Sequence, residues 1–249
     1  IKWKSIPAPQ RGEYIRRFGE ELRSQKNHLA ATITKEARKI KTESEGEVQE
    51  AIDMCDFAVG LSRQLYGLTM PSERPNHRLQ EIWHPIGTIG CITAFNFPIA
   101  VFAWNFCLAA VCGNSVIWKP SPHSNLCARK IKDSWDKVSD EFADLILILE
   151  GEKEEAVAMC EDPAISLISA TGSTQMGKEL APLVSKRLGK LLLELGGNNA
   201  AIVCPSADLD LTIKGIAFSA CGTTGQRCTS LRRLFVHEDI YDDCIARLK

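Results

Sequence analysis

Apolar residues recur at helical spacing through the first sixty positions, separated by charged and polar residues. Two such series share this spacing: Tyr14, Phe18, Leu22, Leu29, Ile33 and Ala37, followed by Val48, Ile52, Cys55 and Val59. Each series would lie on one face of a helix. The pattern therefore predicts two amphipathic helices in the first seventy residues.

Prolines interrupt this helical pattern between Met70 and Gly87. Pro71, Pro75 and Pro85 fall within this stretch, and proline breaks a helix because it lacks an N–H donor. Between them, Arg78–Trp83 has the composition of an extended segment. We predict a ribbon near residues 70–86.

From Gly87 onward, short apolar runs alternate with amphipathic stretches. The predicted strands are Thr88–Ala94, Ser115–Trp118, Leu145–Leu149, Ile165–Ser169 and Leu191–Leu195. The helices predicted between them are Pro98–Cys112, Asn125–Val138, Glu154–Cys160 and Ser173–Val184. This alternation predicts an α/β fold with a doubly wound, Rossmann-like parallel sheet. Ligands bind such sheets beyond the carboxyl ends of the strands.

A second unit is predicted to begin near Asn198. Its expected elements are strand Ala200–Cys204, helix Leu211–Cys221, strand Arg233–His237 and a last helix. We place a cofactor-binding domain at residues 1–197 and the start of an α/β catalytic domain at residues 198–249. Two strands and two helices are too few to close a core, so we expect this second domain to be incomplete.

Composition narrows the class of protein. Apolar residues make up 45% and charged residues 24% of the chain, as in a globular domain, and the formal net charge is -1. This charge gives no reason to expect nucleic acid or an anionic membrane as partner. The ten cysteines form no CxxC pair and the five histidines do not cluster, so we expect reduced thiols and no metal. The longest apolar stretch, Phe97–Cys112, is shorter than a membrane span. A cytoplasmic location is expected, and the start at Ile1 leaves organellar targeting open.

Two residues stand in settings that suit covalent chemistry. Glu194 ends an apolar run and precedes Gly196 and Gly197, whereas Cys228 follows Gly225-Gln226-Arg227. A thiol is mostly protonated at neutral pH, so a nucleophilic cysteine needs a base or a cation nearby. Two more ordinary interpretations stay open: a core cysteine, and a carboxylate paired with a lysine.

The segment from Gly172 to Lys178 combines a strand end, a glycine turn and a helix start. Such a helix N-terminus is suited to bind a phosphate. The spacing also fits the core of a P-loop, which would make the chain a nucleotide triphosphatase. However, a P-loop needs Ser or Thr after the lysine, and this chain has Glu179. A plain strand–helix turn without a ligand is the third interpretation.

Five motifs in order resemble those of the NAD(P)-dependent aldehyde dehydrogenase superfamily. They are Phe95-Asn96-Phe97-Pro98, Trp118-Lys119-Pro120-Ser121, Thr171-Gly172-Ser173-Thr174 with Gly177, Leu193-Glu194-Leu195-Gly196-Gly197, and Gly225-Gln226-Arg227-Cys228. Each motif alone is weak, but their combined order is specific.

The resemblance implies a role for each motif. Cys228 would be the nucleophile, Glu194 the base, and the Asn96 amide an oxyanion donor together with the Cys228 backbone N–H. Without the resemblance, Asn96 could instead cap the following helix, and Lys119 could be an ordinary surface lysine. The implied cofactor-binding residues are Trp118, Lys119, Pro120, Ser121, Gly172, Ser173, Gly177, Leu195 and Gly196. Many members place a glutamate on the adenosine ribose where this chain has Pro122, so NAD is expected and NADP stays open.

Within the superfamily, Met70–Pro85 and Leu195–Ala200 resemble the antiquitin branch. That branch implies α-aminoadipate semialdehyde as substrate, while a generic or betaine-type aldehyde stays open. Family chains are about twice this length. Because about half of that length is missing here, we expect no turnover by these residues alone. For the complete protein, the resemblance implies a homo-oligomer, dimer or tetramer, with the ribbon near residues 70–86 as an oligomerisation element. The alternative is a catalytically incompetent scaffold that acts only in cofactor binding or assembly.

Overall fold

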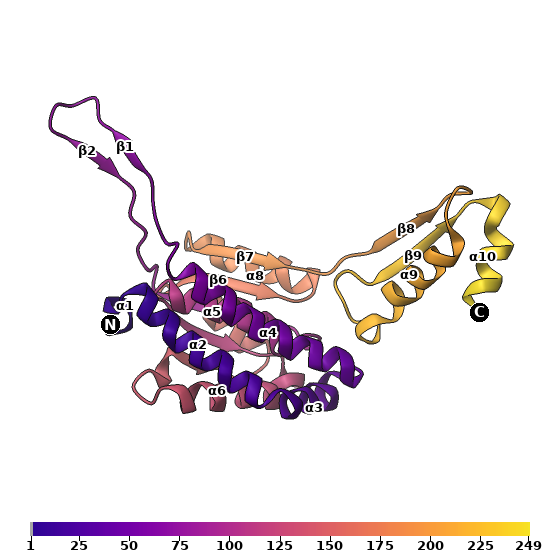
Figure 1. Ribbon diagram of the computed structural model, residues 1–249, viewed down its shortest axis with the longest axis horizontal. Helices are drawn as coiled ribbons and strands as arrows, with labels where there is room; N and C mark the ends of the chain where they lie inside the picture. The colour runs from indigo at the N-terminus through magenta and orange to yellow at the C-terminus, as the bar shows by residue number, and fades with distance from the viewer. Residues whose placement is uncertain (1) are drawn as a thin grey trace.

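The computed structural model describes residues 2–249, and its N-terminal part is a layer of helices (Figure 1). These helices are α1 (Lys2–Ser5), α2 (Ala8–Ser24), α3 (Lys26–Ala37) and α4 (Lys41–Leu61). The prediction of only two helices was wrong, because the first apolar series is divided between α2 and α3. Gln25, with φ -101° and ψ 8°, leaves the helical conformation between them. Arg38 then ends α3 in the left-handed region at φ 61°. Neither position carries the glycine or proline that would signal a break.

The predicted ribbon is present as an antiparallel pair that projects from the body of the molecule (Figure 1). Strand β1 (Thr69–Pro71) pairs with β2 (Arg78–Gln80). Near its base, Trp83 is 64% exposed. The ribbon's role in oligomer formation stays a prediction.

A five-stranded sheet with every neighbouring pair parallel forms the centre of the fold, in the order β5-β4-β3-β6-β7. Its strands are β3 (Thr88–Ile92), β4 (Ser115–Lys119), β5 (Ile146–Ile148), β6 (Ile165–Thr171) and β7 (Lys190–Glu194). The helices between them are α5 (Ala100–Val111), α6 (Asn125–Val138), α7 (Lys153–Glu161) and α8 (Thr174–Lys186). The predicted doubly wound α/β fold is therefore confirmed.

The sheet separates two apolar cores. Alternate residues of β3 enter different cores: Ile89 and Cys91 pack with α2–α6, whereas Ile92 packs with α7 and α8. This division follows from the two-residue period of a strand, which points successive side chains to opposite faces. At the centre of the first core, the Trp118 ring stacks on Phe102 with their centroids 3.7 Å apart.

Two carboxylates from the N-terminal layer, the half-buried Glu36 and the buried Glu47, cap helices that flank the sheet. Glu36 accepts the backbone N–H groups of Leu126 and Cys127 at the start of α6, at 2.9 and 2.8 Å. Glu47 accepts those of Ile99 and Ala100 at the start of α5, at 2.7 and 3.1 Å. A negative charge at the N-terminus of a helix also interacts favourably with the helix dipole. The N-terminal helices therefore hold α5 and α6, the helices of the first two βα units, in place.

Beyond β7, the chain extends away from the sheet into a smaller unit (Figure 1). It contains β8 (Asn199–Val203), α9 (Leu209–Cys221), β9 (Leu231–Val236) and α10 (Tyr241–Leu248), with β8 and β9 parallel. Its buried apolar side chains are Val203, Ile216 and Cys244, whereas Ile202 is 77% exposed. The domain boundary at residues 197/198 stays a proposal.

No helix within residues 2–249 is both long enough and apolar enough to cross a membrane.

Candidate active site

The predicted motifs meet at the carboxyl edge of the central sheet because its strands are parallel. Backbone hydrogen bonds tie neighbouring strand ends together at this edge. Thr93 N–H donates to the Lys119 carbonyl at 3.1 Å, and Gly172 N–H donates to the Glu194 carbonyl at 3.0 Å. Glu194 is the exposed last residue of β7. No lysine or arginine lies within ion-pair distance of its carboxylate in the described part of the chain.

Cys228 lies exposed in the turn between α9 and β9. Its backbone contacts the segment that follows Glu194. Asn199 Nδ2 donates to the Cys228 carbonyl at 2.6 Å. A Cβ added at Gly197 would lie 2.9 Å from the same oxygen, so only glycine allows this approach. The two motifs, about thirty residues apart, are thus brought together through backbone contacts.

Asn96, which follows β3, contacts the turn that holds Cys228 (residues 222–230, the nucleophile turn). Its Nδ2 donates to the Gln226 carbonyl at 2.7 Å. An amide NH₂ has two hydrogens, so the second can donate elsewhere. The alternative in which Asn96 caps the next helix is wrong, because α5 begins at Ala100 and Glu47 provides its cap. The sequence offered no local sign of this, since Glu47 lies about fifty residues upstream.

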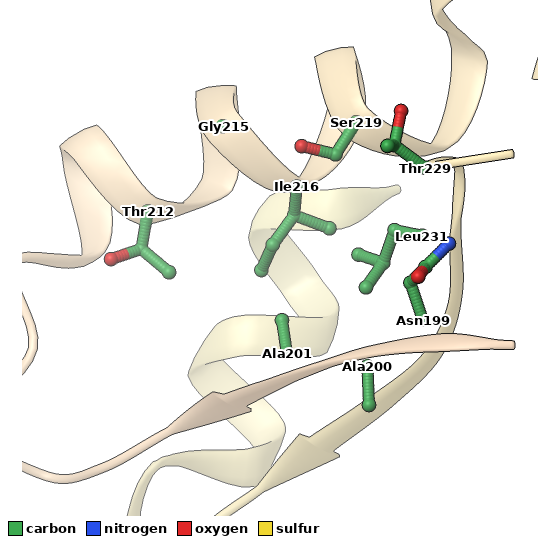
Figure 2. Close-up of a pocket in the computed structure, with 9 residues that line it drawn as sticks. All are labelled: Asn199, Ala200, Ala201, Thr212, Gly215, Ile216, Ser219, Thr229 and Leu231. Atoms are coloured by element: carbon green, nitrogen blue, oxygen red, sulfur yellow. The ribbon is translucent and has the colours of Figure 1, made fainter. Parts of the chain in front are cut away.

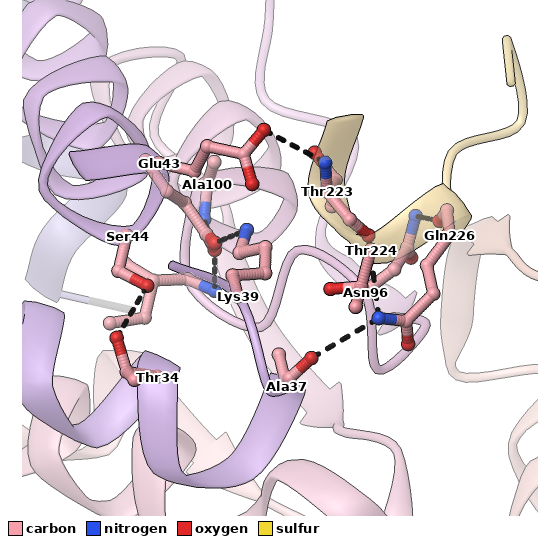
Figure 3. Close-up of polar contacts among 12 residues, drawn as sticks. Thr34, Ala37, Lys39, Glu43, Ser44, Asn96, Ala100, Thr223, Thr224 and Gln226 are labelled. Carbon is pink, nitrogen blue, oxygen red and sulfur yellow. Dashed lines mark hydrogen bonds and ion pairs between the residues drawn. The ribbon is translucent and has the colours of Figure 1, made fainter. Parts of the chain in front are cut away.

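The nucleophile turn also rests on the N-terminal helices, as Figure 3 shows. Glu43 Oε1 accepts the Thr223 N–H at 2.8 Å, and Gln226 Nε2 donates to the Ala37 carbonyl at 3.2 Å. Thr223 and Thr224 have φ values of 54° and 58°. Such conformations cost about 1–3 kcal/mol each for non-glycine residues, so the surroundings must maintain them. These contacts join segments about 180 residues apart and leave no local pattern in the sequence.

The residues around Lys119 divide into core and site residues. Trp118 is buried, and its Nε1 donates to Thr93 Oγ1 at 2.9 Å, so its indole packs in the core and only its backbone lies at the strand end. Lys119 Nζ donates to the Gly151 carbonyl at 2.9 Å. Burial lowers the pKa of the Lys119 ammonium. Pro120 is buried, and Ser121 Oγ accepts the His123 N–H at 3.3 Å.

The predicted strand end, glycine turn and helix start are present where β6 leads into α8, and phosphate binding there stays a prediction. Ser173 is the N-cap residue and its Oγ accepts the Met176 N–H at 3.1 Å. Because Gly172 N–H already donates to Glu194, a phosphate there would rely on the N–H groups that follow. Gly177 faces Leu195: an added Cβ would lie 2.6 Å from Leu195 Cδ1. Gly196 lies near the same helix start, where its Cβ position is 3.9 Å from Thr174 Oγ1.

A hollow of about 340 Å³ lies between α9 and strands β8 and β9 (Figure 2). Ile216 and Leu231 line it, and Thr229 joins it to the nucleophile turn. Glu194 and Asn96 are not among its lining residues. The hollow therefore adjoins the candidate site and does not contain its polar groups.

The other thiols and acidic groups of residues 2–249 indicate no second catalytic or metal site. All ten cysteines are free in the described residues. Cys204 and Cys221 are exposed like Cys228, although Cys204 belongs to an apolar run. Residues 2–249 contain no group of three or more His, Cys, Asp or Glu side chains placed to hold a metal ion. Exposure alone does not distinguish Cys228; the contacts of its turn with Asn96 and Asn199 do.

Comparison with known proteins identifies the family. The sequence matches the aldehyde dehydrogenase family over residues 1–249. It is 48% identical over 249 residues to aldehyde dehydrogenase family 7 member A1 of Malus domestica, covering 99% of this chain and 49% of that protein. It is 46% identical over 250 residues to α-aminoadipic semialdehyde dehydrogenase of Bos taurus, covering 99% and 46%. The chain therefore belongs to the aldehyde dehydrogenase family, and it spans about half the length of these relatives.

Solved structures agree with this assignment. Lactaldehyde dehydrogenase from Escherichia coli matches with a TM-score of 0.93 and 28% identity, over 99% of this chain and 52% of that one. An NAD-dependent aldehyde dehydrogenase from Sinorhizobium meliloti matches with a TM-score of 0.92 and 26% identity, over 99% and 49%. The family uses NAD(P) as cofactor. The P-loop interpretation is thereby set aside, and Glu179, where a P-loop needs Ser or Thr, pairs with Lys153 at 2.7 Å.

Proposed function

We propose that the protein containing this chain oxidises an aldehyde to a carboxylate with NAD(P)⁺ through a covalent cysteine intermediate. One observation carries the proposal: the turn that holds Cys228 contacts both Asn96 and the segment after Glu194. A nucleophile, an amide donor and a carboxylate are thereby assigned to one edge of the sheet. Membership of the aldehyde dehydrogenase family supports this chemistry.

The proposed reaction has two halves. The Cys228 thiolate attacks the aldehyde carbon, and the developing oxyanion accepts hydrogen bonds from Asn96 Nδ2 and the Cys228 N–H. Loss of a hydride then converts the thiohemiacetal to a thioester. Glu194 takes a proton from water, which attacks the thioester and releases the carboxylate and the free thiol. Exposure of Glu194 suits a base that must be reached by water.

The cofactor supplies the hydride acceptor for this reaction. The residues at the sheet edge fit a dinucleotide in two respects. Lys119 places a buried ammonium at the end of β4, where it would donate to ribose hydroxyls. Ser173, Gly177 and Leu195 form a close-packed start to α8, where backbone N–H groups and the helix dipole favour a pyrophosphate. We assign the adenosine end to Lys119 and the pyrophosphate to α8.

For the substrate, we propose α-aminoadipate semialdehyde. The support is similarity to proteins of that name from Bos taurus and Rattus norvegicus, at 46% and 47% identity. A generic or betaine-type aldehyde is the competing class. We further propose that the complete protein is a homo-oligomer in which the exposed β1–β2 ribbon takes part.

The test is the full-length protein incubated with NAD⁺ or NADP⁺ and a panel of aldehydes that includes aminoadipate semialdehyde. We expect reduced cofactor to appear at 340 nm, with aminoadipate semialdehyde giving the highest kcat/KM. Cys228→Ala should abolish the reaction, whereas Cys221→Ala, a matched exposed thiol, should retain it. A fully active Cys228→Ala variant would overturn the mechanism, and preference for another aldehyde would overturn only the substrate.

A further inference from the structure

The turn that precedes Cys228 has a backbone that its own residues do not favour. Thr223, Thr224 and Gly225 are consecutive left-handed residues, with φ values of 54°, 58° and 66°. Glycine adopts this region readily, but a β-branched residue there is an outlier. Contacts from outside the turn must therefore maintain this shape.

Glu43, in the first turn of α4, provides the principal outside contact. Its Oε1 accepts the Thr223 N–H at 2.8 Å and lies 3.7 Å from the Arg227 guanidinium. Arg227 in turn donates from Nε to Thr223 Oγ1 at 2.6 Å. One carboxylate thus meets both ends of the turn, from a position 180 residues away in the chain. Figure 3 shows the Glu43–Thr223 bond together with the Gln226–Asn96 and Gln226–Ala37 contacts.

The Glu43 carboxylate is largely shielded from water. The Glu43 side chain is 19% exposed and that of Arg227 is 32% exposed, so water competes only partly for their interaction. The other contacts of the turn with the N-terminal helices are weaker neutral hydrogen bonds. Thr224 Oγ1 reaches the Arg38 carbonyl at 3.3 Å, and Gln226 Nε2 reaches the Ala37 carbonyl at 3.2 Å.

The turn positions the two groups proposed to donate hydrogen bonds to the oxyanion, Asn96 Nδ2 and the Cys228 N–H. The Gln226 carbonyl accepts from Asn96 Nδ2, and Arg227 immediately precedes Cys228. A shift of the turn would therefore move the Asn96 amide and the Cys228 N–H together. Donors that stabilise a transition state act only when they are placed before the reaction begins.

We propose that Glu43 is a positioning residue, which fixes the left-handed turn at residues 223–227 and through it both oxyanion donors. The proposal rests on the roles given above to Cys228 and Asn96. The Glu43 carboxylate contacts Thr223 and Arg227 and none of the residues assigned above to the cofactor, so its removal should affect the chemical step and leave cofactor binding in place.

The experiment compares Glu43→Ala and Glu43→Gln in the full-length protein with Glu45→Ala and Glu45→Gln. Glu45 lies on the same helix and pairs with Lys41, which is well exposed. We expect Glu43→Ala to lower kcat about 10- to 100-fold, with KM for NAD(P)⁺ and the melting temperature close to those of Glu45→Ala. Glu43→Gln keeps an acceptor for Thr223 N–H and loses the charge facing Arg227. It should retain most activity, with a kcat three- to ten-fold below that of Glu45→Gln.

A second measurement does not depend on the reaction. Hydrogen exchange of residues 222–230 should be faster in Glu43→Ala than in Glu45→Ala. If the wild-type protein oxidises no aldehyde, the proposed function fails, but this exchange difference still decides whether Glu43 holds the turn. Unchanged exchange, or a kcat of Glu43→Gln equal to that of Glu45→Gln, would overturn the proposal. So would parallel losses of kcat, cofactor affinity and melting temperature, because they would indicate a general structural role.

Discussion

Replacing Glu47 should test how the N-terminal helices support the site. Its side chain is fully buried, and its carboxylate accepts three donors: the N–H groups of Ile99 and Ala100 and the ammonium of Lys39. The Lys39 side chain is itself only 1% exposed. Glu47→Ala would leave all three donors buried without this acceptor.

The loss in free energy of unfolding for Glu47→Ala follows from these contacts. Removing one partner of a buried ion pair costs about 3–5 kcal/mol, because the remaining charge stays buried. The two N–H groups lose their acceptor as well, so we expect the upper part of this range. For a chain of this size, 1 kcal/mol corresponds to about 2–4 °C in melting temperature. At about 4–5 kcal/mol, Glu47→Ala should therefore lower the melting temperature by about 8–20 °C.

Glu47→Gln separates the contribution of the negative charge from that of the hydrogen-bond acceptor. It keeps an oxygen for the Ile99 and Ala100 N–H groups and loses the charge opposite Lys39, so we expect about 1.5–3 kcal/mol. Adding Lys39→Met to Glu47→Gln should cost little more, because the unpaired ammonium is then gone.

Thermal and urea unfolding followed by circular dichroism provide the assay, with Glu45→Ala as control. Glu45 pairs with an exposed lysine, so its loss should cost less than about 1 kcal/mol. A melting temperature of Glu47→Ala within 2 °C of this control would refute the reasoning. In that case, the cap on α5 would contribute nothing to stability.

Three further predictions follow from the same structure. Burial raises the pKa of the Glu47 carboxyl, against the opposing effects of Lys39 and the two N–H groups. A raised folded-state pKa gives stability that is present below the unfolded value of about 4.3 and is lost as pH rises. The melting temperature of Glu47→Gln should accordingly gain on the wild type as pH rises above about 4, and a constant difference would contradict this. Gly177→Ala should weaken NAD⁺ binding about ten-fold by displacing Leu195, with little change in melting temperature, as fluorescence titration and calorimetry would show. Unchanged affinity would remove Gly177 from the site. Iodoacetamide at pH 8 should label the exposed thiols within minutes and spare Cys160, whose pKa burial raises to about 11. Peptide mass spectrometry would check this, and early labelling of Cys160 would contradict it. The thiols expected to react first are Cys204, Cys221 and Cys228.

Much of the fold could be predicted because the local spacing of apolar and polar residues indicates which face of each helix or strand is buried. The helix predicted at Asn125–Val138 has those bounds in the structure, since its apolar stripe and polar face repeat with the helical period. The strand ends that hold Lys119 and Glu194 were also located, because short apolar runs bounded by turn residues are typical of a parallel sheet. The break at Gln25 was missed, because neither glycine nor proline marks it.

The order of the motifs, the alternation of strands and helices, and the candidacy of Cys228 and Glu194 were determined by the sequence alone. Tertiary structure decided which distant groups complete the site. Glu47 caps the helix for which Asn96 was the alternative cap, and Glu43 reaches a turn 180 residues away. Periodicity records which face of an element is buried, but a hydrogen bond across the fold leaves no local pattern. Such partners appear only when the packed helices and strand ends bring donor and acceptor within 3 Å of each other.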